Sequence, residues 1–173
     1  AVFKHIKDKE EQKKIKDMTN KLFELKSASG TFNETYFHKM HKLLDVFQLN
    51  KIRITRQHVL NEVCSYMKEH SMFPALFFVM SRKQVEICAQ EITISVLEDD
   101  SKVPYTIGRE CEHIMRRLPN HAEYMALPEY TTIVQLLEKG IAIHHSGVLP
   151  VFKEMIELLY GKGMIKIIFC TET

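Results

Sequence analysis

Short apolar runs alternate with amphipathic segments from Pro74 to Cys170, and this alternation most constrains the fold. The run at residues 75–80 is continuous in apolar side chains, and shorter apolar runs follow at 141–143 and at 165–170, where Lys166 is the one polar residue. Such runs are typical of strands that are buried on both faces of a parallel sheet. Segments with helical apolar spacing separate them, so the order strand, helix, strand, helix, strand predicts an α/β fold with a parallel sheet.

Helix signals between these runs lie at defined positions. Pro128 and Pro150 each stand in the first turn of a predicted helix, where a missing N–H has no cost. Gly140 is expected just beyond the end of the first of these two helices, at the C′ position. A further helix is predicted over 105–118, and another directly follows the strand at 75–80.

The residues before Pro74 have a different character. Asn33 and Thr55 are candidate N-caps of two helices, and a third apolar stripe precedes them. We therefore expect a mainly helical leading segment or linker at residues 1–71, and an α/β domain at residues 72–173. The first stripe consists of Ile15, Met18, Leu22 and Leu25.

Composition excludes several classes of protein. No apolar run approaches the ~18–20 residues of a membrane span, and the first residues contain no secretory signal. The four cysteines have no Cys-x-x-Cys spacing, which argues against a zinc ribbon and favours reduced core thiols. We expect an intracellular protein without a membrane partner; the sequence leaves open whether it is cytoplasmic or nuclear.

The charge is unevenly distributed along the chain. Residues 1–60 carry 13 Lys and Arg against 7 Asp and Glu, a net charge of +6, whereas the remainder carries −4. A basic first third is compatible with attraction to phosphates and also with a solvated, lysine-rich helix face. Both interpretations stay open at this point.

Three polar loops follow the predicted strands: Ser81-Arg82-Lys83, His144-His145-Ser146-Gly147 and Thr171-Glu172-Thr173. In a parallel sheet the carboxyl ends of the strands meet at one edge, which is where ligands bind. Arg82 and Lys83 oppose the dipole of the helix that follows, so either a phosphate or a surface salt bridge, for example to Glu86, is expected to compensate them. The threonines can donate hydroxyls to a phosphate or cap a following helix.

The two adjacent histidines argue against a metal site. In an extended segment, His144 and His145 point to opposite sides and cannot easily share one ion. We expect one imidazole to pack inward and be hydrogen-bonded while the other faces the loop edge. Exposed N–H groups of Ser146 and Gly147, next to the helix at Pro150, suit an anion, although the local sequence by itself favours a plain structural turn over a site.

Common catalytic motifs are absent from the sequence. It contains no Gly-x-x-x-x-Gly-Lys-[Ser/Thr] phosphate loop, no Gly-x-Gly-x-x-Gly, no Gly-x-Ser-x-Gly and no His-Glu-x-x-His. The chain by itself therefore has no evident machinery to bind and split a nucleotide.

Two segments nevertheless resemble a known family. Residues 74–86, PALFFVMSRKQVE, look like motif IV of superfamily 2 helicases of the superkiller and exosome type. Residues 136–150, LLEKGIAIHHSGVLP, resemble motif IVa of that family, and the match continues to Tyr160. Residues 165–173, IKIIFCTET, look like the start of motif V, with Cys170 in place of the usual alanine.

This resemblance implies an incomplete second RecA-like domain of a DExH-box ATP-dependent RNA helicase. It implies that Ser81, Arg82, Lys83, His145, Ser146, Gly147 and Thr171 bind nucleic acid, and that Glu172 and Thr173 lie at the nucleotide cleft. It implies ATP and Mg²⁺ as cofactors of the parent protein, and RNA and the first RecA-like domain as partners. No catalytic residue and no metal ligand is expected among the 173 residues.

The resemblance also sets limits on activity. The sequence starts at Ala1 and stops within motif V, and the arginines of motif VI are absent, so we expect a fragment that hydrolyses no ATP alone. One alternative is a non-catalytic RecA-like module that binds RNA or a protein partner. A weaker alternative is a DNA helicase of the same superfamily.

Overall fold

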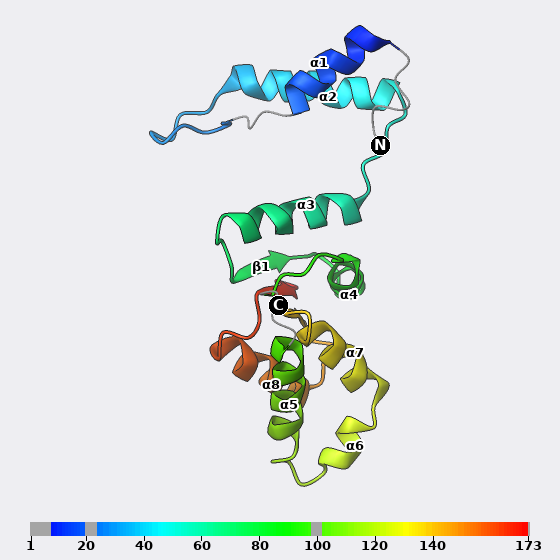
Figure 1. Ribbon diagram of the computed structural model, residues 1–173, viewed down its shortest axis with the longest axis vertical. Coiled ribbons are helices and arrows are strands. Elements are labelled where there is room, and N and C mark those ends of the chain that lie inside the picture. The colour runs from blue at the N-terminus through cyan, green and yellow to red at the C-terminus, as the bar shows by residue number, and fades with distance from the viewer. Residues whose placement is uncertain (1–7, 20–23, 98–101, 173) are drawn as a thin grey trace. The chain divides into compact units, whose positions relative to one another are not determined.

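The computed structural model describes residues 8–19, 24–97 and 102–172, and the chain forms two compact units, Ala1–Thr55 and Arg56–Thr173 (Figure 1). The division between these units falls between Thr55 and Arg56, earlier in the chain than the boundary predicted at residues 71 and 72. Helix α3 (Arg56–Glu69) belongs to the second unit, where it packs on α4 (Arg82–Glu91). The extent of the helicase domain itself stays a prediction.

The first unit is mainly helical, as predicted. It contains α1 (Lys9–Thr19) and α2 (Glu34–Leu49), and its small core is formed by buried Ile15 and Phe47. The side chain of Asn33 caps α2 by accepting a hydrogen bond from the N–H of Tyr36 at 3.2 Å. Of the predicted apolar stripe, Ile15 and Met18 belong to α1, Leu22 lies outside the described residues, and Leu25 is not in a helix.

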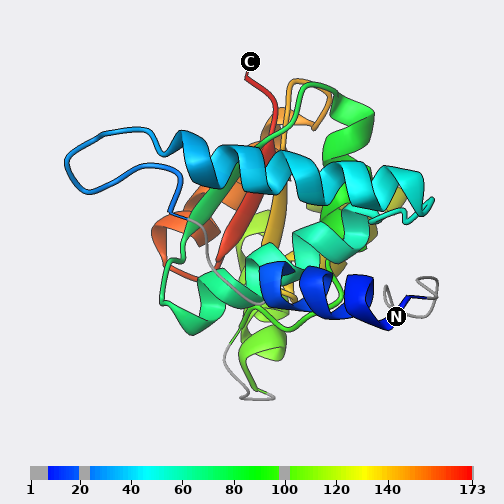
Figure 2. The ribbon, with the colours of Figure 1, turned by 90° about the horizontal axis from the view of Figure 1, so that it is seen from above.

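The second unit is an α/β domain built on a parallel sheet. The strands are β1 (Ala75–Phe78), β2 (Ile141–His144) and β3 (Ile167–Cys170), in the spatial order β1-β3-β2. Figure 2 shows β3 between the other two, with the carboxyl ends of all three strands on the same side. This arrangement confirms the α/β class and agrees with an incomplete RecA-like domain.

The described residues of this unit form five further helices around the sheet. Their bounds are α4 (Arg82–Glu91), α5 (Lys102–Met115), α6 (His121–Met125), α7 (Pro128–Leu137) and α8 (Pro150–Gly161). The prolines at the starts of α7 and α8 confirm the predicted helix starts. The helix α5 begins three residues before the predicted residue 105, and α6 was not predicted. None of the described helices is long and apolar enough to cross a membrane.

Gly140 connects α7 to β2 in the way its position predicts. Its φ is +77°, the left-handed region that glycine adopts without steric cost. A Cβ at this position would come within 2.6 Å of Leu97. The Gly140 carbonyl also accepts hydrogen bonds from the N–H groups of Lys166 and Ile167, which fixes the start of β3.

The core of the second unit lies on β2, β3 and the helices against them. All residues of β3 are buried, and the largest fully buried side chains include Phe152, Phe169 and Met115.

The expectation that β1 is buried on both faces is wrong. Leu76 and Phe78 are 52% and 66% exposed, because β1 is an edge strand and only its alternate residues meet the core.

All four cysteines are buried free thiols, as the sequence predicted. Burial raises the pKa of Cys64 to about 11 and that of Cys111 to about 12, because a thiolate is poorly solvated in an apolar core. These groups therefore act as small apolar side chains at neutral pH.

Candidate nucleic-acid interface

The three predicted loops leave the sheet at the same level. Cys170 of β3 stands in register with Phe78 of β1 on one side and with His144 of β2 on the other. The N–H of Val79 donates to the Cys170 carbonyl at 2.8 Å, and that of Thr171 donates to the His144 carbonyl at 3.3 Å. The parallel register thus gathers the polar residues that follow each strand at one edge of the domain.

Ser81 and the two basic residues after it form the first loop and the start of α4. Ser81 has an extended backbone and stands at the N-cap position, but its hydroxyl makes no capping hydrogen bond. Arg82 and Lys83 are exposed in the first turn of α4, and neither takes part in the ion pairs found among the described residues. The salt bridge to Glu86 considered from the sequence is therefore not formed, and the positive charges remain at the positive end of the helix dipole.

His145 is the buried member of the histidine pair. Its ring is only 4% exposed, and its Nδ1 accepts a hydrogen bond from the N–H of Gly147 at 3.1 Å. Because Nδ1 is an acceptor, the ring proton lies on Nε2, which is 3.4 Å from a carboxylate oxygen of Glu86. The inward-packed, hydrogen-bonded imidazole expected from the sequence is thus that of His145.

His144 points away and has a different partner. Its Nε2 lies 2.9 Å from a carboxylate oxygen of Glu157 on α8, and its side chain is 36% exposed. The two imidazoles therefore have separate carboxylate partners on separate helices. Within residues 8–19, 24–97 and 102–172, no three His, Cys, Asp or Glu side chains gather as a metal site would require.

Gly147 brings the second loop against the first. An added Cβ would lie 3.0 Å from Nδ1 of His145 and 3.6 Å from Cδ of Arg82. The aliphatic stem of Arg82 therefore passes close to the backbone of Gly147, although the two residues belong to different strand ends. Arg82 and Ser146, one from each of these two strand ends, are both exposed.

One of the two N–H groups predicted to be open in this loop is used inside the protein. The Gly147 N–H donates to His145 Nδ1, and the Val148 N–H, next in the chain, donates to the His145 carbonyl at 3.1 Å. The prediction that these backbone groups cradle an anion is therefore wrong for Gly147, and for Ser146 it stays a prediction.

The third loop is described only in part. Thr171 is half-buried and Glu172 is exposed, whereas Thr173 lies outside the described residues. The sequence did not indicate that Glu86 faces His145. Glu86 lies one turn after Arg82 on the same helix, and that spacing favoured Arg82 as the partner of Glu86 instead.

The chain is similar to several known proteins. No family model matches the chain. The antiviral helicase SKI2 of Saccharomyces cerevisiae is 34% identical over 115 residues, which are 65% of this chain and 8% of that protein. The DExH-box ATP-dependent RNA helicase DExH9 of Arabidopsis thaliana is 31% identical over 137 residues, 78% of this chain and 12% of its own.

A human RNA helicase is similar to the chain to nearly the same degree. The exosome RNA helicase MTR4 of Homo sapiens is 30% identical over 117 residues, which are 65% of this chain and 10% of that protein. The chain thus spans only about a tenth of the length of these relatives. The resemblance to helicases of the superkiller and exosome type is confirmed.

Proposed function

We propose that this chain, a sequence relative of the superkiller- and exosome-type DExH-box RNA helicases, is part of a second RecA-like domain that grips the phosphates of one RNA strand. The observation that carries the proposal is the packing of Arg82 against Gly147. It joins the loops after β1 and β2 into one surface on which a guanidinium is exposed without an acidic partner among the described residues.

Each loop has a role that follows from its geometry. Arg82 and Lys83 supply positive charge, and the guanidinium offers a planar pair of donors to a phosphate. Ser81, Ser146 and Thr171 supply hydroxyl groups at the same edge. Since such contacts address the backbone of the nucleic acid, binding is expected to ignore base sequence and to weaken with salt.

His145 and Gly147 enter the proposal as residues that shape the loop. The imidazole of His145 is buried and its Nδ1 is already bonded, so it is poorly placed to meet a phosphate itself. Gly147 keeps open the space beside the His145 ring, since an added Cβ would lie 3.0 Å from Nδ1 of that ring. In this proposal, His145 and Gly147 therefore hold the shape of the loop after β2 and do not bind a phosphate with their own side chains.

ATP and Mg²⁺ belong to the parent helicase in this proposal. The sequence has no phosphate loop, and Glu172 is the only described member of the predicted nucleotide-cleft pair. These residues do not form a complete nucleotide site. We assign to the chain one wall of a cleft whose other wall is the first RecA-like domain.

Fluorescence anisotropy with a labelled 12-nucleotide oligouridylate tests the proposal on the 173-residue chain. We expect weak, saturable binding whose logarithmic salt dependence has a slope of roughly −0.7 for each phosphate contact. The double variant Arg82→Gln/Lys83→Gln is expected to lower both the affinity and the slope.

A matched variant separates this site from the basic first unit. Lys13→Gln/Lys14→Gln removes the same charge from exposed positions of α1. If this variant loses as much affinity as the α4 variant, binding is a general charge effect and the proposal fails. Equal binding of oligothymidylate would favour the DNA-helicase alternative, whereas absence of any nucleic-acid binding would favour a protein-binding module.

A further inference from the structure

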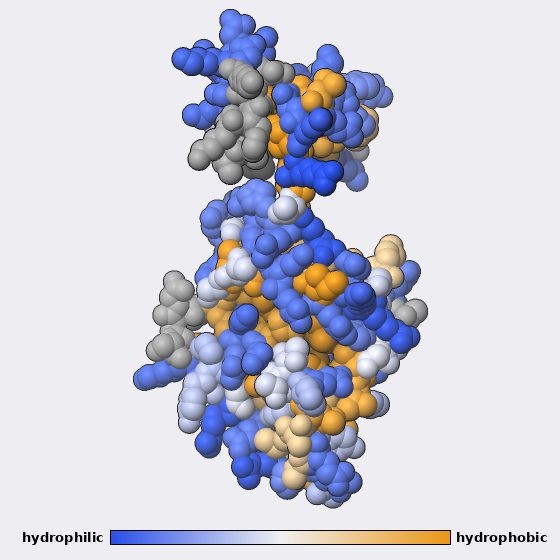
Figure 3. All heavy atoms as spheres, turned by 90° about the vertical axis from the view of Figure 1, so that its right-hand side faces the viewer, coloured by the Kyte–Doolittle hydropathy of each residue, from blue (hydrophilic) through white to orange (hydrophobic). Residues whose placement is uncertain are grey.

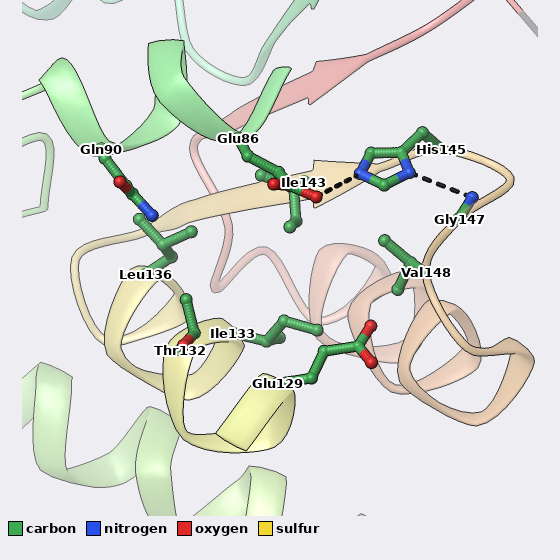
Figure 4. Close-up of a pocket in the computed structure, with 10 residues that line it drawn as sticks. All are labelled: Glu86, Gln90, Glu129, Thr132, Ile133, Leu136, Ile143, His145, Gly147 and Val148. Atoms are coloured by element: carbon green, nitrogen blue, oxygen red, sulfur yellow. Dashed lines mark hydrogen bonds and ion pairs between the residues drawn. The ribbon is translucent and has the colours of Figure 1, made fainter. Parts of the chain in front are cut away.

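A cavity of about 330 Å³ lies between α4, α7 and the end of β2, behind the loop that carries His145 (Figure 4). Its apolar wall comes from Ile133, Leu136, Ile143 and Val148. Figure 3 views the side of the molecule on which α4 and α7 lie, and apolar surface there is bordered by hydrophilic residues. The cavity is within the size range of sites that hold a small ligand or one long side chain.

Two carboxylates share this cavity. Glu86 enters from α4 and Glu129 from α7, and Figure 4 shows their side chains reaching into the space from opposite sides. None of the described residues that line the cavity is Lys or Arg, and Glu129 is in none of the ion pairs found among the described residues. Like charges held in one partly apolar space favour the binding of a cation.

A buried imidazole faces one of these carboxylates. Nε2 of His145 is directed at Glu86 from 3.4 Å, beyond the length of a good hydrogen bond, and has no hydrogen-bond partner among the described residues. The ring is 96% buried behind the wall of the cavity, with its proton on Nε2. The carboxylate of Glu86 therefore lies beside a buried polar group and keeps the capacity to accept hydrogen bonds from a ligand.

The residues that line the cavity favour one class of ligand over others. Two carboxylates repel a phosphate, and the described residues do not provide the three clustered ligands that a metal ion requires. Gln90 and Thr132 add neutral acceptors to the rim, and the apolar wall fits a hydrocarbon stem. These features favour an organic cation with an apolar stem.

We propose that this cavity binds the arginine side chain of a protein partner. A guanidinium has five donors in a planar fork, which matches two carboxylates and two neutral acceptors better than the point charge of an ammonium group. The methylene stem of the arginine lies along Ile133, Leu136 and Val148. The inference does not depend on the proposed RNA contacts, because the carboxylates that would meet the arginine are not the groups that would meet a phosphate. His145 and Gly147 border both sites.

NMR of the methyl-labelled 173-residue chain tests this assignment with Nα-acetyl-arginine methylamide as the probe. We expect saturable shifts of the methyl groups of Ile133, Leu136, Ile143 and Val148. The citrulline analogue, which has the same shape without the charge, is expected to bind roughly five- to tenfold more weakly, as the loss of a charge-assisted hydrogen bond predicts. Oligouridylate is not expected to compete with the probe.

Substitutions define the result that would overturn the proposal. Glu129→Gln is expected to weaken binding of the arginine probe roughly five- to tenfold, and Glu69→Gln, an exposed carboxylate of α3, to leave it unchanged. Unaltered methyl dispersion shows that each variant is folded. Equal binding of the arginine and citrulline probes, no saturable shift at these methyl groups, or competition by oligouridylate would each contradict an arginine site.

Discussion

The Nδ1 atom of His145 accepts a hydrogen bond from the backbone N–H of Gly147 at 3.1 Å, across a loop of three residues. This bond closes the loop after β2 on a buried ring, and the other nitrogen of that ring faces Glu86 of α4. The second loop of the candidate interface therefore lies against the helix that carries Arg82.

Replacing Arg82 with glutamine is expected to weaken RNA binding and to stabilise the fold slightly. The guanidinium has no ion-pair partner among the described residues and lies at the positive end of the α4 dipole. Removing the charge should raise the free energy of unfolding by about 0.3–1 kcal/mol. Urea denaturation and RNA anisotropy measure the two effects, and Arg109→Gln, an exposed change on α5, should alter neither. A destabilised Arg82 variant would show that the side chain has a structural partner.

Gly147→Ala is expected to weaken RNA binding roughly two- to tenfold, an effect of about 0.5–1.4 kcal/mol. The new Cβ would come 3.0 Å from Nδ1 of His145, so the loop must shift and the hydrogen bond must lengthen. Gly161→Ala is the matched control, because an added Cβ there meets no atom within 4 Å. Equal RNA affinity of the two alanine variants would show that the close packing at Gly147 does not shape the interface.

His145→Asn and His145→Gln separate the two contacts of the imidazole. The amide oxygen of asparagine can take the place of Nδ1 and keep the bond to Gly147, whereas glutamine reaches toward Glu86 instead. We expect His145→Ala to lose about 1–3 kcal/mol in the free energy of unfolding and asparagine to recover part of it. The salt slope of RNA binding should stay unchanged in His145→Asn, since a positioning residue neutralises no phosphate. A reduced slope would mean that His145 contacts RNA directly.

The buried thiols predict a loss of stability at high pH. The folded-state pKa values of Cys64 and Cys111 are raised to about 11 and about 12, above the ordinary value of 9.0. Their contribution is therefore fully present below pH 9 and is lost as the pH rises toward 11–12, because only the unfolded chain gains thiolates there. Urea unfolding of the wild type and Cys111→Ala between pH 8 and 10.5 measures this, and the variant should show the shallower decline.

The 173-residue chain is expected to hydrolyse no ATP, with or without RNA. Its sequence has no phosphate loop, so nothing in it is built to hold the γ-phosphate. A coupled assay of phosphate release, with heat-denatured chain as the background, makes the measurement. Turnover above that background, retained through a second purification step, would contradict the prediction.

Much of the fold followed from local patterns. Proline at the starts of α7 and α8, glycine after α7 and the Asn33 cap each act within one turn of the chain, and the structure confirms them. The exposed face of β1 did not follow from its apolar run. A run of four apolar residues is the same in a central and in an edge strand, and only the neighbours of the strand decide how much of it is buried.

The sequence by itself determined that three polar loops share one edge, because parallel strands place their carboxyl ends together. It did not determine which histidine is buried, which N–H groups remain open, or that Glu86 faces His145 and leaves Arg82 unpaired. Glu86 and Glu157, the carboxylates that face the two histidines, lie on other elements than the loop itself. Hydrogen bonding and ion pairing depend on distance in space, so only the packing of α4, α8 and the loop after β2 decided them.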